Sequence, residues 1–294
     1  MTHSPEPDTG ATGPGWRDFA RTHWSRGPAV VTDAPGPGLA PEAVHALLAA
    51  AATRPGATRL TTSDALLPDP GPLLPGPRDP DISAYVRRLA HAPELSGDGW
   101  LLTAADPLAH DPVSWSRVRD VLDGLWRLVG RPPLPVTAEL AAGDRHHTPD
   151  EQPAQADTAG LTWVLDGALT VRVRPEHTGT EYVLHARAGD LVHWPAGSRR
   201  LEHRPGPCTT LHLAVPARRD AALPHVCEVL AALMRDPAPG PPPSAPSAAS
   251  VTPDGRLTVP AALREHAERF RHALADRAPE RALLLRWAAL CSAA

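Results

Sequence analysis

Lysine and asparagine are absent from this chain of 294 residues, and all 29 of its basic residues are arginines. Codon usage in a GC-rich genome accounts for both absences. The absence of lysine nevertheless has a chemical consequence. It excludes a Schiff-base lysine, a P-loop lysine and a lysine anchor for an anionic cosubstrate, together with the functions that depend on those groups.

The chain also has few cysteines, no long apolar run and only a small net charge. Cys208, Cys227 and Cys291 are too few and too scattered for a disulfide framework or a zinc pattern, which indicates a reducing compartment. The first residues lack the basic start and apolar core of a secretory signal, and no apolar run approaches the roughly 20 residues of a membrane span. We therefore expect a cytoplasmic protein with no membrane contact. The net charge of −4, with both signs interspersed, gives no basic stripe for nucleic acid.

Proline is abundant, with 37 residues, and hydrophobic residues make up 42% of the chain, enough for a core. Composition also suggests an order of regions. We expect a disordered tail over residues 1–14, a main domain over 15–220, a helix over 221–235, a Pro/Ala/Ser linker over 236–250 and a small helical region over 251–294.

Helical periodicity dominates the chain before residue 134. The sequence predicts helices at Trp16–His23, Pro41–Ala52 and Ser114–Val129, strands at Pro28–Thr32 and Trp100–Thr103, and an irregular stretch over 63–80. Gly130 stands where the last of these helices is expected to end.

Between Leu134 and Pro216 the apolar period changes to two. The segments VTAEL, LTWVL, LTVRV, EYVLHA, DLVHW and TTLHLAV read as short strands separated by turn residues such as Asp166-Gly167. Several short strands over about 80 residues suit a closed barrel or a double-sheet jelly roll. The predicted fold class is therefore α+β, with a barrel core over 134–216, helices before it and a mainly helical region after it.

The segment Ala188–His203, AGDLVHWPAGSRRLEH, is the most informative of the chain. Gly189, followed by Pro195 and Gly197, indicates a strand that runs into a Pro-x-Gly turn. The pattern resembles the second signature of cupin barrels, in which the third residue after the last glycine is the histidine that closes a metal site. That residue is Arg200 here.

Taken in order, the motifs resemble those of the JmjC-type cupins, in particular the bacterial ribosomal-oxygenase branch. FARTHWSRGPAVVTDAP resembles the opening helix and strand, WLLTAADPLAHDPVSWSRVRDVLDGLWRLVGRP the strand and helix before the barrel, and GLTWVLDGALTVRVRP, ARAGDLVHWPAGSRR and TTLHLAVPA the barrel itself. The resemblance covers roughly residues 16–235 and implies a double-stranded β-helix. The helical end of the chain is similar to that family's dimerisation and winged-helix region, which implies a homodimer.

Members of that family are iron(II)/2-oxoglutarate hydroxylases, whose iron is held by two histidines and one carboxylate. Matched residue by residue, Ala154 and Ala156 fall on the first histidine and the carboxylate. Leu169 falls on the lysine that grips 2-oxoglutarate, and Arg200 falls on the last histidine. Alanine and leucine offer no ligand atom, and a guanidinium stays protonated and only donates hydrogen bonds. The resemblance therefore implies a barrel that binds neither iron nor 2-oxoglutarate.

An alternative keeps an active hydroxylase with relocated ligands. The loop before the second barrel strand offers the pair His147 and Asp150, or the pair His146 and Glu151, and His203 lies three residues after Arg200. If the loop and the strand shift in register, His147, Asp150 and His203 supply a metal site for iron(II), with 2-oxoglutarate as the cosubstrate. Otherwise His146 and His147 belong to a solvated polar loop.

Arg200 needs a carboxylate partner if it lies in the barrel mouth, because an unpaired buried charge is costly. One interpretation is an internal salt bridge to Asp150, Glu139 or a neighbour, which holds the emptied site shut. The other is that Arg200, with Arg199 or Arg172, grips a small anionic ligand or an acidic peptide through its forked donors.

The sequence thus favours a degenerate oxygenase that is kept for binding a protein, a peptide or a small anion, with no cofactor and no catalytic residue. The alternatives are the iron(II)/2-oxoglutarate hydroxylase and, more weakly, a DNA-associated regulator that uses its C-terminal arginines. Acidic residues balance those arginines, so nucleic acid is not the expected partner. His185, His193 and His212 stand in alternating apolar strands, where packed or hydrogen-bonded histidines are expected.

Overall fold

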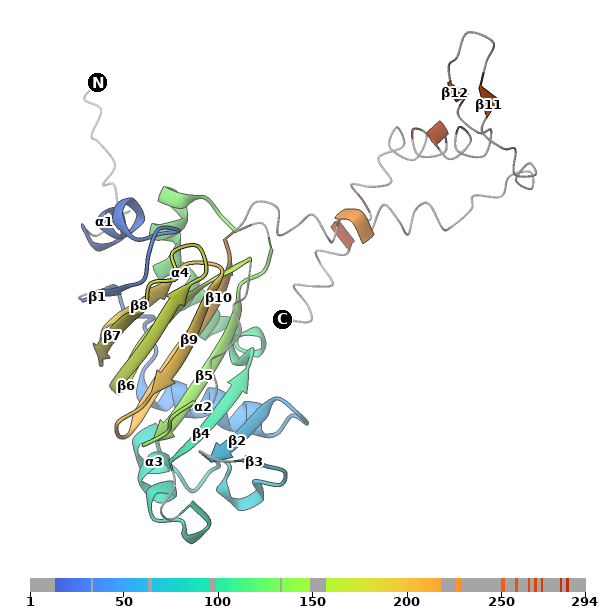
Figure 1. The fold of residues 1–294 in the computed structure, drawn as a ribbon. Coiled ribbons are helices and arrows are strands. Elements are labelled where there is room, and N and C mark those ends of the chain that lie inside the picture. Colours follow the sequence, from blue (N-terminus) through green and yellow to red (C-terminus); the bar gives the residue numbers. More distant parts are fainter. Residues whose placement is uncertain are drawn as a thin grey trace, which may run out of the picture. The chain divides into compact units, whose positions relative to one another are not determined.

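The computed structural model describes residues 14–32, 34–62, 65–95, 99–132, 134–148 and 157–217, and isolated positions beyond residue 225. The chain divides into two compact units, Met1–Arg218 together with Ala294, and Arg219–Ala293. The first unit consists mostly of antiparallel strands with a few helices, as Figure 1 shows. None of the helices that the structure describes is long and apolar enough to cross a membrane.

The elements of the first unit follow one another in a simple order. Its α-helices are α1 (Pro14–Thr22), α2 (Pro41–Ala52), α3 (Ile82–Ala90) and α4 (Pro112–Val129), and its short 3-10 helices are η1 (Gly71–Leu73), η2 (Pro93–Leu95) and η3 (Pro107–His110). Its strands are β1 (Ala29–Val31), β2 (Thr58–Thr62), β3 (Leu66–Leu67), β4 (Trp100–Ala105), β5 (Thr137–Asp144), β6 (Thr158–Pro175), β7 (Tyr182–Arg187), β8 (Leu191–Trp194), β9 (Ser198–His203) and β10 (Cys208–Pro216).

The helices α1, α2 and α4 form where the sequence predicts them. The carboxylate of Asp111 caps α4 by accepting hydrogen bonds from the backbone N–H groups of Val113 and Ser114. Pro112 follows at the first helical position, and Gly130 ends the helix at a positive φ of 87°. β2, β3, α3 and β9 are among the elements that were not predicted. For β2 and α3 the neighbouring proline-rich sequence hides the periodicity.

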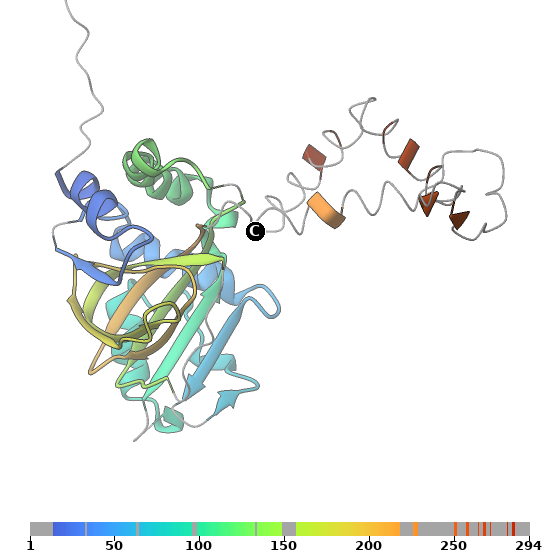
Figure 2. The same ribbon diagram turned by 45° about the horizontal axis from the view of Figure 1, so that its top comes forward.

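The strands form one antiparallel sheet in which β6 is the central element. The order along the sheet is β1-β8-β6-β10-β5-β4-β2-β3, and β7 and β9 also pair with β6. Residues 158–167 of β6 pair with β10, whereas its Thr170–Pro175 half pairs with β9. The sheet therefore folds back on itself along β6, and the view in Figure 2 shows this curvature from one end.

The sequence predicts two strands separated by a turn at Asp166-Gly167, and this prediction is wrong. β6 continues through both residues, and Gly167 adopts a positive φ of 77° that favours glycine. A Cβ at Gly167 would lie 1.9 Å from the carbonyl oxygen of Pro207. The glycine therefore bends one long strand from the first half of the barrel into the second.

Two apolar clusters lie on opposite faces of the folded sheet. The larger cluster packs the helices against the outer face and includes Leu48 of α2, Leu122 of α4 and Leu140 of β5. The smaller cluster fills part of the barrel interior and includes Val171 of β6 and Trp194 of β8. Alternation along each strand thus directs successive side chains either to the interior or to the outer face, which the helices cover in part.

The second unit contains a short antiparallel pair, β11 (Ser250–Val251) with β12 (Leu257–Thr258). Residues 226–228 are helical. Most of the predicted helix over 221–235, the linker over 236–250 and the rest of the region over 251–294 lie outside the described residues, as does nearly all of the tail over 1–14. The predicted domain boundaries therefore stay predictions.

Candidate functional site

Strand β9 carries the charged residues of the barrel interior on one of its faces. Arg200 faces Val173 across the ladder to β6, and Val173 belongs to the interior apolar cluster. Because side chains alternate along a strand, Arg200 and Glu202 point inward, and Arg199 and His203 point outward. The chain continues this pattern to Arg204, which is 1% exposed.

Arg200 lies inside the barrel with its charge compensated. Its Nε donates a hydrogen bond of 3.1 Å to Oε1 of Glu202, and its side chain is 12% exposed. The guanidinium carbon lies 5.0 Å from the centroid of the Trp194 ring, in a cation–π arrangement. The structure shows the internal salt bridge that one interpretation of Arg200 predicts, and the carboxylate partner is the neighbouring residue Glu202.

A second arginine binds the same carboxylate. Nη2 of Arg204 donates to Oε2 of Glu202 at 3.0 Å and to Oγ1 of Thr210 at 3.2 Å. Desolvation opposes the charged form of Glu202, but Arg204 and Arg200 outweigh it and lower the pKa of Glu202 to about 2. Glu202 is therefore a carboxylate with both oxygens occupied.

His212 of β10 completes the interior cluster next to these charges. Its Nδ1 lies 2.9 Å from Oγ1 of Thr162, and its ring stacks on Trp194 at 5.3 Å between centroids. Desolvation, followed by the charge of Arg200, lowers the pKa of His212 to about 3, so the imidazole is neutral. Trp194 fits there because Gly160 opposite it has no side chain, and a Cβ at Gly160 would lie 2.1 Å from the indole.

Glu139 of β5 faces His212 across the ladder and opens the cluster to solvent. Its side chain is exposed, yet desolvation by surrounding atoms and the charge of Glu202 raise its pKa. The exposure and the raised pKa are compatible if the carboxyl group of Glu139 reaches water on one side and is surrounded by protein on the others. We call the set Glu139, Arg200, Glu202, Arg204 and His212 the interior charge cluster.

The described residues do not fit an iron(II)/2-oxoglutarate site. No three His, Cys, Asp or Glu side chains within the described ranges are grouped so that they could hold a metal ion. In the interior charge cluster the carboxylate of Glu202 is already bound by two guanidiniums. A guanidinium about 4 Å from a singly charged cation repels it by about 4 kcal/mol at an effective dielectric near 20. For a divalent metal ion the repulsion from each guanidinium is twice as large.

The structure separates the arginines that the sequence groups as an anion site. Arg174 faces Arg199 across the ladder, so Arg199 and the alternating Arg172 lie on the outer face, opposite Arg200. Arg172 is exposed, and Nε of Arg199 lies 3.8 Å from Oε1 of Glu176. Arg200 is therefore the member of the predicted trio that faces the interior.

Leu169, which the sequence resemblance matches to the cosubstrate lysine, is buried in the interior apolar cluster. Ala154 and Ala156 lie outside the described residues, as does Asp150. Their assignments at the ligand positions stay predictions from the sequence.

The other predicted metal ligands lie together but on the outside of the barrel. His147 and His203 form an isolated antiparallel bridge, and both are exposed. His146, which was expected in a solvated loop, is instead buried at 3% exposure, and desolvation lowers its pKa to about 4. This part of the loop therefore continues the sheet, with His146 turned inward and His147 outward.

The remaining strand histidines are packed or hydrogen-bonded, as expected. Nδ1 of His193 lies 3.0 Å from the carbonyl oxygen of Gly160, and its ring is fully buried against Phe19 and Trp24. Nδ1 of His185 lies 3.1 Å from Oγ1 of Thr170.

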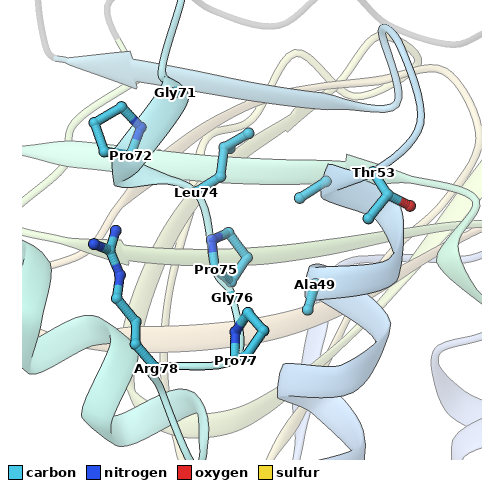
Figure 3. A pocket seen from close by; sticks show the side chains of 10 residues that line it. Ala49, Thr53, Gly71, Pro72, Leu74, Pro75, Gly76, Pro77 and Arg78 are labelled. Atoms are coloured by element: carbon cyan, nitrogen blue, oxygen red, sulfur yellow. The ribbon is translucent and has the colours of Figure 1, made fainter.

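Two surface hollows offer less chemistry than the interior charge cluster. One, of about 370 Å³, lies between α2 and the segment Gly71–Arg78. Figure 3 shows Pro72, Pro75 and Pro77 in its lining, with Arg78 at one side. The other, of about 430 Å³, is lined by residues around the β8–β9 turn, including Glu176 and His177. The hydroxyl of Thr53 and the guanidinium of Arg78 are the only polar side-chain groups among the lining residues of the first hollow.

Sequence reasoning missed Glu202 and Arg204 as members of the site. A signal was available, because residues 200, 202 and 204 alternate along one strand and therefore share a face. The contributions of Trp194 and His212 were not predictable in this way, since they come from other strands and depend on the closure of the barrel.

The bent strand β6 pairs with β8 and β10 along one half and with β7 and β9 along the other, and this arrangement defines a cupin-type jelly roll. Two solved structures of YcfD, a ribosomal oxygenase from Escherichia coli, are similar to this chain. One aligns with a TM-score of 0.50 and 13% identity over 88% of this chain and 66% of that chain. The other gives the same TM-score and identity over 89% and 66%.

YcfD has also been solved in complex with cobalt and 2-oxoglutarate, and that structure aligns with a TM-score of 0.49. This chain thus spans about two thirds of the length of YcfD. At 13% identity the likeness shows a shared fold alone. No protein-family profile and no curated protein matches the sequence.

Proposed function

We propose that this chain is a binding protein built on a JmjC-like cupin barrel, in which a fixed charge cluster has replaced iron and 2-oxoglutarate chemistry. The observation that carries the proposal is the ion pair of Arg200 with Glu202 on the inner face of β9. Leucine at position 169 and alanine at positions 154 and 156 support it, because none of these side chains offers a charge or a ligand atom.

The ligand that suits this cluster carries an acidic group, as a protein, a peptide or a small anion does. Arg200 uses Nε for Glu202, and its two terminal amino groups make no hydrogen bond to another described residue. Such a pair of parallel donors matches a carboxylate in bidentate geometry. The exposed Glu139 marks the side from which solvent reaches the cluster.

The alternative of an active hydroxylase has less support. His147 and His203 lie on the outer face of β9, on the other side of the strand from Arg200. The DNA-regulator alternative depends on C-terminal arginines that lie largely outside the described residues. As part of the proposal we keep a cytoplasmic location and a homodimer through the C-terminal region.

The loss of oxygenase chemistry is tested by anaerobic loading with iron(II) and 2-oxoglutarate. We expect no 2-oxoglutarate-dependent iron retention and no release of CO₂ above the level of the buffer. Arg200→His is expected to stay inactive as well, because the two alanine positions still lack ligand atoms. Stoichiometric iron with turnover of 2-oxoglutarate in the wild type would overturn the proposal.

The binding role is tested with a short polyglutamate peptide as the probe. We expect Arg200→Gln to weaken its binding by roughly tenfold, which corresponds to about 1.4 kcal/mol. Arg172→Gln is the matched control, since Arg172 is exposed on the outer face. Equal losses in both variants, or binding that ignores Arg200, would contradict a site inside the barrel.

A further inference from the structure

His147 and His203 form a non-hydrogen-bonded pair of an antiparallel bridge. The backbone hydrogen bonds flank them on both sides: N–H of Arg204 donates to the carbonyl of His146 at 2.8 Å, and N–H of Thr148 donates to the carbonyl of Glu202 at 3.0 Å. Residues directly opposite in such a pair have the closest Cα atoms and the closest side chains of an antiparallel ladder.

The two imidazoles are free to take a ligand together. Their ring centroids lie 5.9 Å apart with an interplanar angle of 63°, and both side chains are exposed. Neither ring makes a hydrogen bond to another residue in the part of the chain that the structure describes. Because backbone bonds hold both strands in place, little conformational freedom of the backbone remains to be lost when a shared ligand binds.

Paired neutral imidazoles are ligands for zinc, nickel and copper ions. A third imidazole stands on the same outer face: Thr170 of β6 faces both His203 and His185, and the Thr170 hydroxyl holds Nδ1 of His185. The described residues nevertheless contain no group of three such side chains close enough to hold one ion. Among the described residues, His147 and His203 are therefore the two available ligands, and water can take the coordination positions that no described side chain fills.

We propose that His147 and His203 bind one divalent transition-metal ion on the outer face of the barrel. The site is separate from the interior charge cluster, because it uses the opposite face of β9 and does not depend on the binding role of Arg200. The bound ion crosslinks residues 146–148 to the end of β9. It thereby fixes the strand that carries Arg200 and Glu202 on its inner side.

The test uses untagged full-length protein, because a histidine tag binds the same ions. Titration calorimetry with Cu²⁺, Ni²⁺ and Zn²⁺ uses a His3→Ala background, because an amino group followed by a histidine at position 3 binds Cu²⁺ and Ni²⁺ by itself. It is expected to give a site that depends on His147 and His203 and is tightest for Cu²⁺. The loss of a residue that only hydrogen-bonds to a metal ligand weakens metal binding by about 10–100-fold. His147 and His203 are proposed as direct ligands, so His147→Ala and His203→Ala are each expected to weaken binding by at least about tenfold. The controls His110→Ala and His177→Ala remove exposed histidines elsewhere and are expected to leave affinity unchanged.

A second measurement separates a lost ligand from a misfolded variant. Without metal, all four variants are expected to unfold at the wild-type urea midpoint, because the four side chains are exposed. With Cu²⁺, electron paramagnetic resonance is expected to show nitrogen couplings from two imidazoles in the wild type and from one in each ligand variant. Unchanged affinity in both ligand variants would overturn the proposal, as would equal losses in the controls. Polyglutamate binding through Arg200 is a separate readout and is expected to survive both ligand variants.

Discussion

Two guanidiniums share one carboxylate inside the barrel, and this sharing defines the site at the scale of single residues. Glu202 binds Nε of Arg200 through one oxygen and Nη2 of Arg204 through the other. A buried ion pair adds little net stability, because desolvation offsets much of the attraction. Removal of one partner is different, since it leaves the remaining charges buried and unpaired.

We therefore expect Glu202→Gln to reduce the free energy of unfolding at neutral pH by about 3 kcal/mol, the lower end of the range for a broken buried pair. The lower end applies because 15% of the Glu202 side chain reaches solvent. Urea denaturation measures the change. Glu181→Gln, which breaks the exposed pair with Arg174, is the control and is expected to cost no more than about 1 kcal/mol. Similar losses of stability in the two variants would show that Glu202 does not neutralise buried charges of Arg200 and Arg204.

The pH dependence of Glu202 gives a second check on the same residue. Its pKa falls from an ordinary value of 4.5 to about 2 on folding. The stabilisation by Glu202 is therefore complete above pH 4.5 and is lost as the pH falls towards 2. We expect the wild type to lose more stability than Glu202→Gln across this window, as measured by urea midpoints. A constant difference between the two proteins would contradict the lowered pKa.

At the scale of elements, the bend in β6 decides where the charged residues lie. Gly167 marks the place where the strand passes from β10 and β8 to β9 and β7. The ladder with β10 also shifts register between Thr209 and Thr210. The bend places β9 over the first half of the barrel, and Arg200 of β9 then meets Trp194 of β8.

Gly167→Ala is expected to destabilise the protein strongly. The positive φ of Gly167 disfavours any side chain, and a Cβ would lie 1.9 Å from the backbone oxygen of Pro207. Strain and overpacking of this kind typically cost about 1–3 kcal/mol each. Thermal unfolding measures the effect, and Gly206→Ala is the control because nothing lies within 4 Å of its added Cβ. Equal melting temperatures for the two variants would argue against a required bend.

At the scale of the whole molecule, three histidines from separate regions are kept neutral. His146 follows β5, His193 lies under α1, and His212 faces the interior charge cluster. Desolvation is the largest cause in each case, and it lowers their pKa values from 6.5 to about 4, 4 and 3. The folded state therefore binds fewer protons than the unfolded state between about pH 6.5 and 4.

We expect the stability of the protein to fall as the pH drops from 6.5 to about 4. Each histidine contributes a slope of up to about 1.4 kcal/mol per pH unit. The raised pKa values of Glu139 and Asp106 act in the opposite sense, because these groups take up protons more readily in the folded state. Urea midpoints across this pH range measure the slope. His212→Gln is expected to flatten it, and an unchanged slope would mean that His212 binds protons equally in the folded and unfolded states.

Much of the architecture was predictable, and the reason is local. Helix α2 has the predicted bounds, because Pro41 and the apolar periodicity mark its start and its buried face. The alternation between residues 134 and 216 predicts the strands but not their connection. Whether Asp166-Gly167 makes a turn or a bend depends on the pairing partners on each side of it, and these are far away in the sequence.

The sequence by itself determined that position 200 carries a permanent positive charge and that no lysine exists to hold an anionic cosubstrate. It also contains charged residues at positions 200, 202 and 204, an alternating spacing that puts them on one face once this segment is extended. Only the tertiary structure decided that this face is the interior, that Glu202 rather than a distant acid neutralises Arg200, and that His147 meets His203 outside the barrel. The physical reason is that strand pairing and barrel closure fix which side chains meet, and both depend on contacts between segments remote in sequence.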